Sequence, residues 1–250
     1  MPHAMRYLNV LGGAAVIAIN QLANYLPLNG QTTGEVAQQF SVIIPVARYA
    51  FSFWFAIYAL IIVFCVYQWR SEETARRLGA PFLASCAFNI AWIFLWHYEL
   101  IALSLLAVLG LVVSVAAGYM RMPPHPEDLA QYLSVNVFFS VYLAWTSIST
   151  VLNGAVVLEQ AGLLYWGTDA IGWLVALIAL AAAYASWVAL SRSDPVFPLA
   201  FIWALLAVTV KSWDIASVAY PALAAAVALA LVSVYVTGRF RVESRLLTPG

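Results

Sequence analysis

Long apolar segments separated by short polar ones make up most of this chain. They lie at approximately 7–26, 42–68, 80–97, 99–120, 130–157, 170–191, 195–211 and 214–238. A helix of about 20 residues spans the hydrocarbon core of a bilayer, and each segment is close to that length or longer. The pattern predicts an all-α integral membrane protein with about eight transmembrane helices and no soluble domain in its loops.

The composition excludes most functions of soluble proteins. Hydrophobic residues make up 64% of the chain and charged residues only 9%, whereas a globular domain carries about 25% charged residues. The formal net charge is zero, so we expect no basic surface and no nucleic-acid partner. Cys65 and Cys86 each lie inside an apolar segment, where a small buried hydrophobic residue is a better interpretation than a disulfide or a metal ligand.

The basic residues predict the orientation of the helices, because Lys and Arg concentrate in cytoplasmic loops. Nine of them fall in alternate loops that we assign to the cytoplasm: Arg6, Arg70, Arg76, Arg77, Arg121, Arg192, Arg239, Arg241 and Arg245. Only Lys211 falls in an outer loop, and Arg48 falls inside the second segment. This alternation predicts that both the N-terminus and the C-terminus are cytoplasmic.

Acidic residues and catalytic motifs are missing from the predicted membrane interior. Every Asp and Glu falls at or beyond the end of a segment, whereas proton- or sodium-coupled transporters usually keep a carboxylate within the membrane. The chain also has no P-loop, HExxH, GxSxG or CxxC motif. The sequence therefore predicts a protein that is not an enzyme, with no metal site.

Polar and aromatic residues fall on one face of several predicted helices. The spacing places Asn20 and Asn24 in the first helix, and three further faces at α-helical spacing in later helices. These are Phe51, Trp54 and Tyr58; Ser85, Asn89, Trp92 and Trp96; and Tyr142, Trp145, Ser149 and Asn153. All four faces lie in the outer half of the bundle. We expect them to form a pocket for a flat, largely apolar ligand beneath the loop 27–39, whose Asn29-Gly30 and Thr33-Gly34 pairs suit tight turns.

Two further residues have alternative interpretations. Arg48 lies about 9 Å along its predicted helix, where it would need either an ion pair with Glu35, Glu99, Glu159 or Asp169 or an anionic group on the ligand. His97, at the outer end of its helix, could ligate the metal of a tetrapyrrole. A single histidine at this position is more commonly only hydrogen-bonded.

Three motifs resemble those of the TspO, or translocator protein, family of tryptophan-rich sensory proteins. They are the run Phe51-Ser-Phe-Trp-Phe-Ala-Ile-Tyr58, the run Asn89-Ile-Ala-Trp92, and the run Tyr142-Leu-Ala-Trp145 with Leu152-Asn153. The outer loop is similar to that of longer bacterial members, and this resemblance implies a bacterial inner membrane as the location. The resemblance covers approximately residues 1–160 and implies a five-helix core there, with 161–250 as an additional three-helix membrane extension. The chain departs from the family at Val141, which stands where the fifth-helix motif has proline.

The resemblance implies a membrane receptor or sensor that binds a porphyrin, haem, sterol-like compound or lipid and can form a homodimer. By matching position, it implies ligand contacts for Trp54, Asn89, Trp92, Tyr142, Trp145 and Asn153. It also leaves open that the ligand is moved across the membrane or that a porphyrin is degraded. The alternative is a structural or pigment-contacting subunit of a larger membrane complex.

Overall fold

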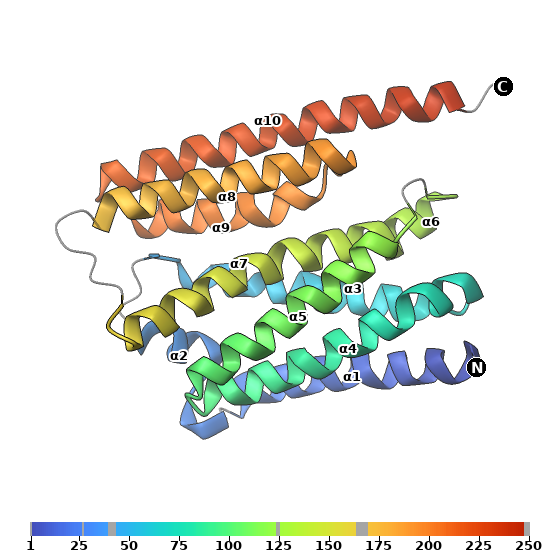
Figure 1. Cartoon of the computed structure of the whole chain (residues 1–250), viewed down its shortest axis with the longest axis horizontal. Helices are drawn as coiled ribbons and strands as arrows, with labels where there is room; N and C mark the ends of the chain where they lie inside the picture. Colours follow the sequence, from blue (N-terminus) through green and yellow to red (C-terminus); the bar gives the residue numbers. More distant parts are fainter. Residues whose placement is uncertain (1, 27, 40–43, 124–125, 164–169, 248–250) are drawn as a thin grey trace. The chain divides into compact units, whose positions relative to one another are not determined.

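A computed structural model of the chain describes residues 2–26, 28–39, 44–123, 126–163 and 170–247 (Figure 1). These residues form helices and connecting turns and contain no strand. The chain divides into two compact units. The N-terminal unit comprises residues 1–42 and 51–165, and the C-terminal unit comprises residues 43–50 and 166–250.

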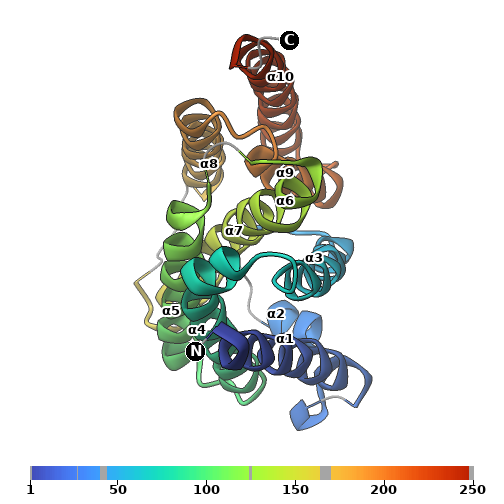
Figure 2. The same ribbon diagram turned by 90° about the vertical axis from the view of Figure 1, so that its right-hand side faces the viewer.

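The N-terminal unit is a bundle of five long helices. In chain order its α-helices are α1 (Pro2–Tyr25), α2 (Thr33–Gln39), α3 (Phe53–Tyr67), α4 (Glu72–His97), α5 (Ile101–Arg121), α6 (Leu129–Gln131) and α7 (Val137–Gln160). Short 3-10 helices precede α2 and α3, at η1 (Leu28–Gly30) and η2 (Arg48–Ser52), and a π-helix, η3 (Tyr132–Asn136), leads into α7. Helix α4 packs against α1 and α5, and α7 packs against α3 and α5 (Figure 2).

Aromatic residues of α3, α4 and α7 form a core in this bundle. The ring of Phe64 in α3 lies 4.8 Å from that of Phe82 in α4 and 5.0 Å from that of Phe138 in α7. All three side chains are fully buried. Helices that meet through such interlocking rings hold a fixed separation, which positions α3, α4 and α7 relative to one another.

The C-terminal unit contains three helices, α8 (Ala170–Arg192), α9 (Phe197–Lys211) and α10 (Ala216–Leu247). Helix α10 packs against both α8 and α9. The buried carboxylate of Asp194 caps α9 by accepting hydrogen bonds from the backbone N–H groups of Val196 and Phe197. The ring of Tyr184 in α8 contacts Phe197 and Phe201 of α9 edge-on.

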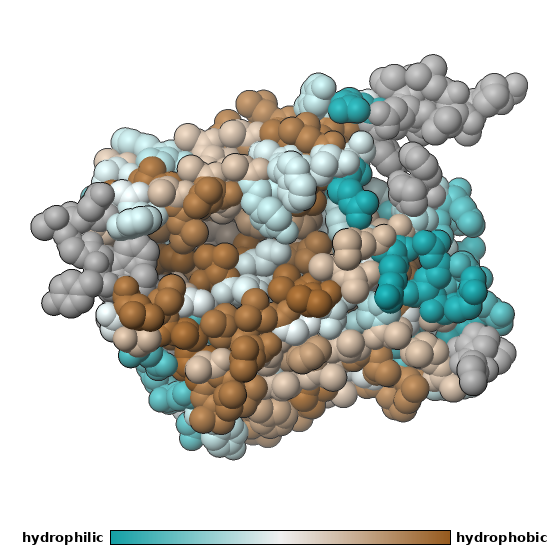
Figure 3. Space-filling model, viewed as in Figure 1, coloured by the Kyte–Doolittle hydropathy of each residue, from teal (hydrophilic) through white to brown (hydrophobic). Residues whose placement is uncertain are grey.

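The helices expose apolar side chains along their flanks, as an integral membrane protein must. Hydrophobic residues cover the sides of the helices in Figure 3, and hydrophilic residues gather toward helix ends. By length and composition, six of the described helices could cross a membrane. Helix α9 is apolar but has only 15 residues, and the amide side chains of α1 lower its hydropathy. A helix is thus present at each of the eight predicted positions, and the all-α membrane fold is confirmed.

Two predicted features between α1 and α3 were wrong. The second predicted segment starts at residue 42, but the helical structure begins at Arg48, because Pro45 has no N–H to donate and disfavours helix in the residue before it. Arg48 is therefore an exposed residue at a helix end rather than a charge inside a helix. The Thr33-Gly34 pair opens α2 instead of forming a turn, whereas Asn29 and Gly30 do turn the chain with positive φ values of 54° and 77°.

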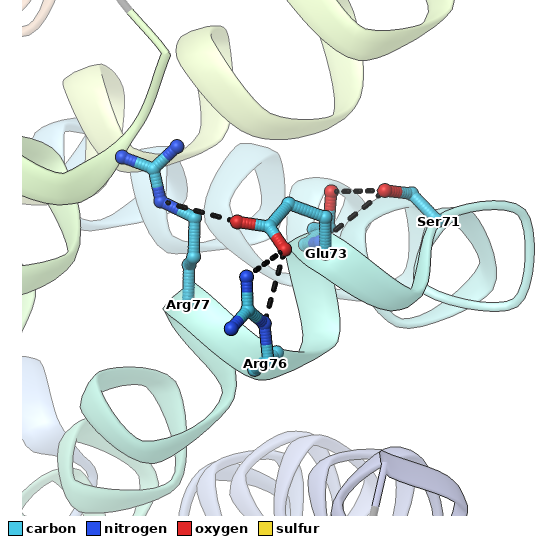
Figure 4. A network of polar contacts seen from close by, with 5 residues as sticks. Ser71, Glu73, Arg76 and Arg77 are labelled. Atoms are coloured by element: carbon cyan, nitrogen blue, oxygen red, sulfur yellow. Dashed lines mark hydrogen bonds and ion pairs between the residues drawn. The ribbon is translucent and has the colours of Figure 1, made fainter.

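The predicted inner loop between α3 and α4 carries a compact polar network (Figure 4). Ser71 caps α4 by accepting a hydrogen bond from the backbone N–H of Thr74 at 3.2 Å. One turn into α4, the Glu73 carboxylate pairs with Arg76 and with Arg77. These three side chains are exposed, so the network is typical of a solvated helix end and not of a binding site.

Candidate functional site

A buried chain of hydrogen bonds links three helices of the N-terminal unit, α1, α4 and α7. The amide nitrogen of Asn20 in α1 donates to the amide oxygen of Asn89 in α4 at 2.8 Å. The amide nitrogen of Asn89 in turn donates to the hydroxyl oxygen of Tyr142 in α7 at 3.4 Å. All three side chains are buried. Because polar groups inside a membrane must be satisfied by other helices, this chain fixes the rotational setting of α1, α4 and α7.

Aromatic rings surround this hydrogen-bonded chain, with Trp54 of α3 at their centre. Trp54 stacks at 6.0 Å on Tyr58 and at 6.0 Å on Trp92 of α4, with interplanar angles of 22° and 27°. Its edge meets Tyr142 and Trp145 of α7 at 6.4 Å. Trp92 continues the stack to Trp96 at 6.0 Å. Three neighbouring helices thus contribute rings to one continuous aromatic wall.

A cavity of about 340 Å³ lies against this wall. Helices α1, α2, α3 and α4 and the end of η2 supply its lining: Asn20, Gln21, Asn24, Tyr25, Thr33, Gly34, Phe51, Ser52, Trp54, Phe55, Tyr58 and Trp92. Two of these residues, Tyr25 and Phe55, are 77% and 57% exposed. The cavity therefore opens sideways where α1 and α3 meet the surroundings, while its inner wall is buried.

The short helix α2 forms one side of the cavity and is tied to α4. The indole N–H of Trp96 donates to the backbone carbonyl of Thr33 at 3.2 Å. The side chain of Asn29, in the turn before α2, donates to the backbone carbonyl of His97 at 3.0 Å. Both hydrogen bonds use the C-terminal end of α4 as an anchor for α2 and for the turn before it.

Two indole groups near the cavity have unsatisfied hydrogen-bond donors. The Nε1 atoms of Trp92 and Trp145 are buried and have no hydrogen-bond partner among the described residues. Trp92 lines the cavity, whereas Trp145 stacks on Phe53 at 4.7 Å behind it. A buried N–H without an acceptor costs about 1–3 kcal/mol, and this cost is removed if a ligand in the cavity supplies an acceptor.

The structure brings together most of the residues that the sequence predicted. Six of them line the cavity, namely Asn20, Asn24, Phe51, Trp54, Tyr58 and Trp92, and four lie behind that lining, namely Asn89, Trp96, Tyr142 and Trp145. Their role in ligand binding remains a prediction.

Three of the predicted residues lie elsewhere. Asn153 exchanges hydrogen bonds with Ser104 of α5 at 3.1–3.2 Å, and Ser149 donates to the carbonyl of Trp145; at this level of α7 the polar contact is with α5. Arg48 belongs to the C-terminal unit. Its ion pairs with Glu35, Glu99 and Glu159 remain predictions, and Asp169 lies outside the described residues.

Spacing did not reveal the part of the lining that comes from Tyr25, Thr33, Gly34, Ser52 and Phe55. One signal for Thr33 was available, because Thr32 and Glu35 have the spacing of a helix-capping box. That spacing predicts a helix over the cavity where we expected a turn.

His97 is held by hydrogen bonds within the protein. Its Nδ1 lies 2.7 Å from the carbonyl oxygen of Ile93, which can only accept, so Nδ1 carries the proton. In the neutral ring Nε2 is then an acceptor, and it lies 3.4 Å from the hydroxyl of Thr33. No group of three or more His, Cys, Asp or Glu residues in the described part of the chain is placed to hold a metal ion.

A protein-family comparison agrees with the resemblance seen in the motifs. The family model described as TSPO-like protein matches residues 6–235. The match extends beyond residues 1–160, which carry the motifs, and includes α8, α9 and most of α10. No curated protein and no solved structure matched the chain. Since the family model covers well over half of its length, this integral membrane protein belongs to the TSPO-like protein family.

Proposed function

We propose that the protein binds a flat, largely apolar ligand in the cavity of its N-terminal unit, and that a porphyrin is the first candidate. The observation that carries the proposal is the buried, unpartnered indole N–H of Trp92 in an otherwise aromatic cavity wall. Such a wall stacks on the face of a ring system, and the donor selects a ligand with an acceptor at its edge. Membership of the TSPO-like family supports a membrane sensor or ligand-binding protein in general.

The size of the cavity supports a ligand that is only partly enclosed. Its volume of about 340 Å³ is at the lower end of the roughly 300–1,000 Å³ of small-molecule sites. The exposed rings of Tyr25 and Phe55 at its side leave room for the rest of a larger ligand to extend outward. A porphyrin would place one edge inside, with an acceptor toward Trp92, and its remaining substituents between α1 and α3.

The hydrogen bonds of His97 support binding through the ring face and not through a metal. Both of its ring nitrogens already face protein groups, the carbonyl of Ile93 and the hydroxyl of Thr33. Releasing Nε2 for a metal would cost one of the contacts between α4 and α2, the one with the Thr33 hydroxyl. We therefore expect a metal-free porphyrin and haem to bind with similar affinity.

Titration of the purified protein in detergent with protoporphyrin IX, followed by the shift of the porphyrin absorbance band, tests this function. Trp92→Phe keeps an aromatic ring but removes the N–H, and it should weaken binding about 2- to 10-fold, the worth of one hydrogen bond. Trp187→Phe is the matched control, because Trp187 lies in α8 and is 66% exposed. If the wild type and Trp92→Phe bind protoporphyrin IX with equal affinity, Trp92 does not belong to the site. If the wild type binds neither protoporphyrin IX nor haem, the proposed ligand class is wrong.

A structural subunit of a larger membrane complex is the second candidate. It is favoured by the large aromatic side chains that the C-terminal unit exposes, Trp173, Trp187, Tyr220 and Tyr235. Such residues suit contacts with another membrane protein or with pigments. Purification of the tagged chain in a mild detergent tests it, because a subunit co-purifies with its partners at a fixed stoichiometry and a free-standing binding protein does not.

A further inference from the structure

An arginine side chain is buried where α1 begins, beside the turn from α3 into α4 (Figure 1). Arg6 is only 5% exposed. Among the described residues its one ion pair is with Glu72, at 3.6 Å between Nη2 and Oε1, and the side chain of Glu72 is 65% exposed. The Nε atom of Arg6 is buried and has no hydrogen-bond partner in the described part of the chain. A buried guanidinium that is paired with one solvated carboxylate is incompletely neutralised.

The packing of α1 around Arg6 holds this guanidinium in place. One turn along the same face of α1, the buried amide nitrogen of Asn9 donates to Oε1 of Gln68 at 2.5 Å. Gly79 of α4 lies against that face, because a Cβ atom added to it would lie 2.5 Å from the side chain of Met5. Helices α1, α3 and α4 are therefore in close contact at this level, and the charge of Arg6 is fixed near the end of the bundle.

Exposed aromatic and aliphatic side chains lie next to the buried guanidinium. Its Cζ atom lies 5.9 Å from the centre of the Trp69 ring, and that ring meets Tyr7 edge-on at 5.2 Å. Both rings are exposed, as are Leu11, one turn further along α1, and Val66, in the last turn of α3. Tryptophan and tyrosine concentrate at the level of lipid head groups, and exposed aliphatic residues beyond them contact the acyl chains.

The charge at this end of the bundle favours an anionic partner. Residues 2–6 of α1 and residues 68–77, between the end of α3 and the second turn of α4, together carry four arginines and two glutamates. A phosphate group forms short, charge-assisted hydrogen bonds with a guanidinium, and basic residues beside a membrane helix attract anionic lipids.

We propose that Arg6 is the centre of a binding site for the phosphate of an anionic glycerophospholipid, whose acyl chains lie along the exposed apolar side chains of α1 and α3. The phosphate supplies the anionic partner that the solvated Glu72 supplies only in part. The site is separate from the ligand cavity, which is lined by the opposite ends of α1 and α3. The inference therefore does not depend on the proposed function.

Native mass spectrometry of the full chain in detergent, titrated with dioleoylphosphatidylglycerol, tests this site. Arg6→Gln removes the charge but keeps a polar side chain, and it should weaken binding about 10-fold or more, as expected for the loss of hydrogen bonds to a charged group. Arg76→Gln is the matched control, because Arg76 lies at the same end of the bundle but is exposed and pairs with Glu73. Its affinity should stay within about twofold of the wild type. Equal affinity of the wild type and Arg6→Gln would overturn the proposal.

Thermal unfolding separates lipid binding from a general loss of stability in Arg6→Gln. A ligand that binds the folded state raises the midpoint of unfolding, so each variant is compared with itself, with and without the lipid. Dioleoylphosphatidylglycerol should raise the midpoint of the wild type and of Arg76→Gln but not that of Arg6→Gln. An equal rise in Arg6→Gln would show that the lipid does not bind through this residue, and the proposal would be wrong.

Competing compounds identify what the site recognises. Dioleoylphosphatidylcholine has the same acyl chains but a head group with no net charge, and it should bind about fivefold more weakly or less. Glycerol 3-phosphate has no acyl chains and should not displace the lipid at equal concentration. Equal binding of phosphatidylcholine would overturn the preference for an anionic head group, and displacement by glycerol 3-phosphate would overturn the lipid in favour of a free phosphate. Loss of lipid binding in Trp92→Phe but not in Arg6→Gln would place the lipid in the ligand cavity and also overturn the proposal.

Discussion

Gly118 of α5 lies directly against the ring of Phe139 in α7. A Cβ atom added at Gly118 would fall inside the van der Waals surface of that ring, and the ring is fully buried and cannot move aside. Small residues at such crossings let two membrane helices approach closely. Close packing of α5 and α7 in turn sets the position of Tyr142 and Trp145, which follow Phe139 within the next two turns of α7.

Gly118→Ala should therefore destabilise the N-terminal unit. Overpacking a filled helix interface typically costs about 1–3 kcal/mol, which thermal unfolding of the purified protein in detergent will show as a lower midpoint. The matched control is Gly238→Ala in α10, where an added Cβ meets nothing within 4 Å. In an exposed helical position this change should be neutral or stabilising by about 0.5–1 kcal/mol. A midpoint for Gly118→Ala equal to that of the control would contradict the packing argument.

At the level of single residues, spacing predicted which side chains face the interior but not what each one contacts. Asn20, Asn89 and Tyr142 were placed on inward faces by their helical spacing, and they do meet in one hydrogen-bonded chain. Helical spacing places Asn153 on the same face of α7 as Tyr142, yet Asn153 hydrogen-bonds to Ser104 of α5. The helix that faces this side of α7 changes along its length. Which residue a side chain contacts depends on how the helices cross in space, and the spacing of residues in the sequence does not give that crossing.

Helix α2 has seven residues and depends on its N-terminal cap. The Glu35 carboxylate accepts hydrogen bonds from the backbone N–H and the hydroxyl of Thr32, at 2.8 and 2.9 Å, and the N–H of Glu35 donates to the Thr32 hydroxyl at 3.3 Å. This reciprocal arrangement is a capping box. A helix this short has little stability of its own, so the cap and the bonds to α4 hold α2 over the cavity.

Glu35→Ala should loosen α2 while leaving the rest of the bundle folded. Loss of a helix cap costs about 0.5–2 kcal/mol, so the backbone amides of α2 should exchange with deuterium several times faster in native-state mass spectrometry. Glu73→Ala is the control, since Glu73 also lies in the first turn of a helix but pairs only with the exposed Arg76 and Arg77. Surface pairs of this kind contribute about 0–1 kcal/mol. Unchanged exchange in α2 would mean that the capping box does not hold it.

Helix positions were predictable from apolar segments, and their ends were less so. Every predicted segment contains a helix, because a run of about 20 apolar residues has few other ways to satisfy its backbone in a membrane. The beginning of η2 at Arg48 instead of residue 42, and the π-helix Tyr132–Asn136, were not predicted. The amide of Asn136 donates to the carbonyl of Pro123, thirteen residues earlier. A contact of this kind depends on tertiary structure and leaves no periodic signal.

For the whole molecule, the structure divides into two units, and a five-helix core over 1–160 with an extension over 161–250 stays a prediction. Residues 43–50 lie between the first and third helices of the sequence but cluster with the C-terminal helices. Hydropathy could not reveal this, because the assignment depends on three specific contacts with α9, made by Ala47, Tyr49 and Ala50.

Charge within each unit is consistent with the predicted orientation. In the N-terminal unit, Arg6, Arg70 and Arg121 lie at one end of the bundle, at the start of α1, after α3 and at the end of α5. In the C-terminal unit, Arg192 ends α8, and Lys211 ends α9 at the opposite end of that unit. If positive charge stays on the cytoplasmic side, the inner end of each unit and both termini are cytoplasmic, and the cavity lies in the outer half of the membrane.

Labelling of single cysteines in intact cells tests this orientation. Tyr98→Cys, between α4 and α5, and Trp213→Cys, between α9 and α10, replace exposed residues that should face outward and react with a membrane-impermeant maleimide. Glu73→Cys, in the first turn of α4, should react only after the cells are permeabilised. The buried Cys65 and Cys86 give a low background. Reaction of Tyr98→Cys but not Trp213→Cys in intact cells would show that the number of crossings between them is odd. In that case either the eight-helix count or the charge argument would fail, and α9, with only 15 residues, would be the helix to re-examine first.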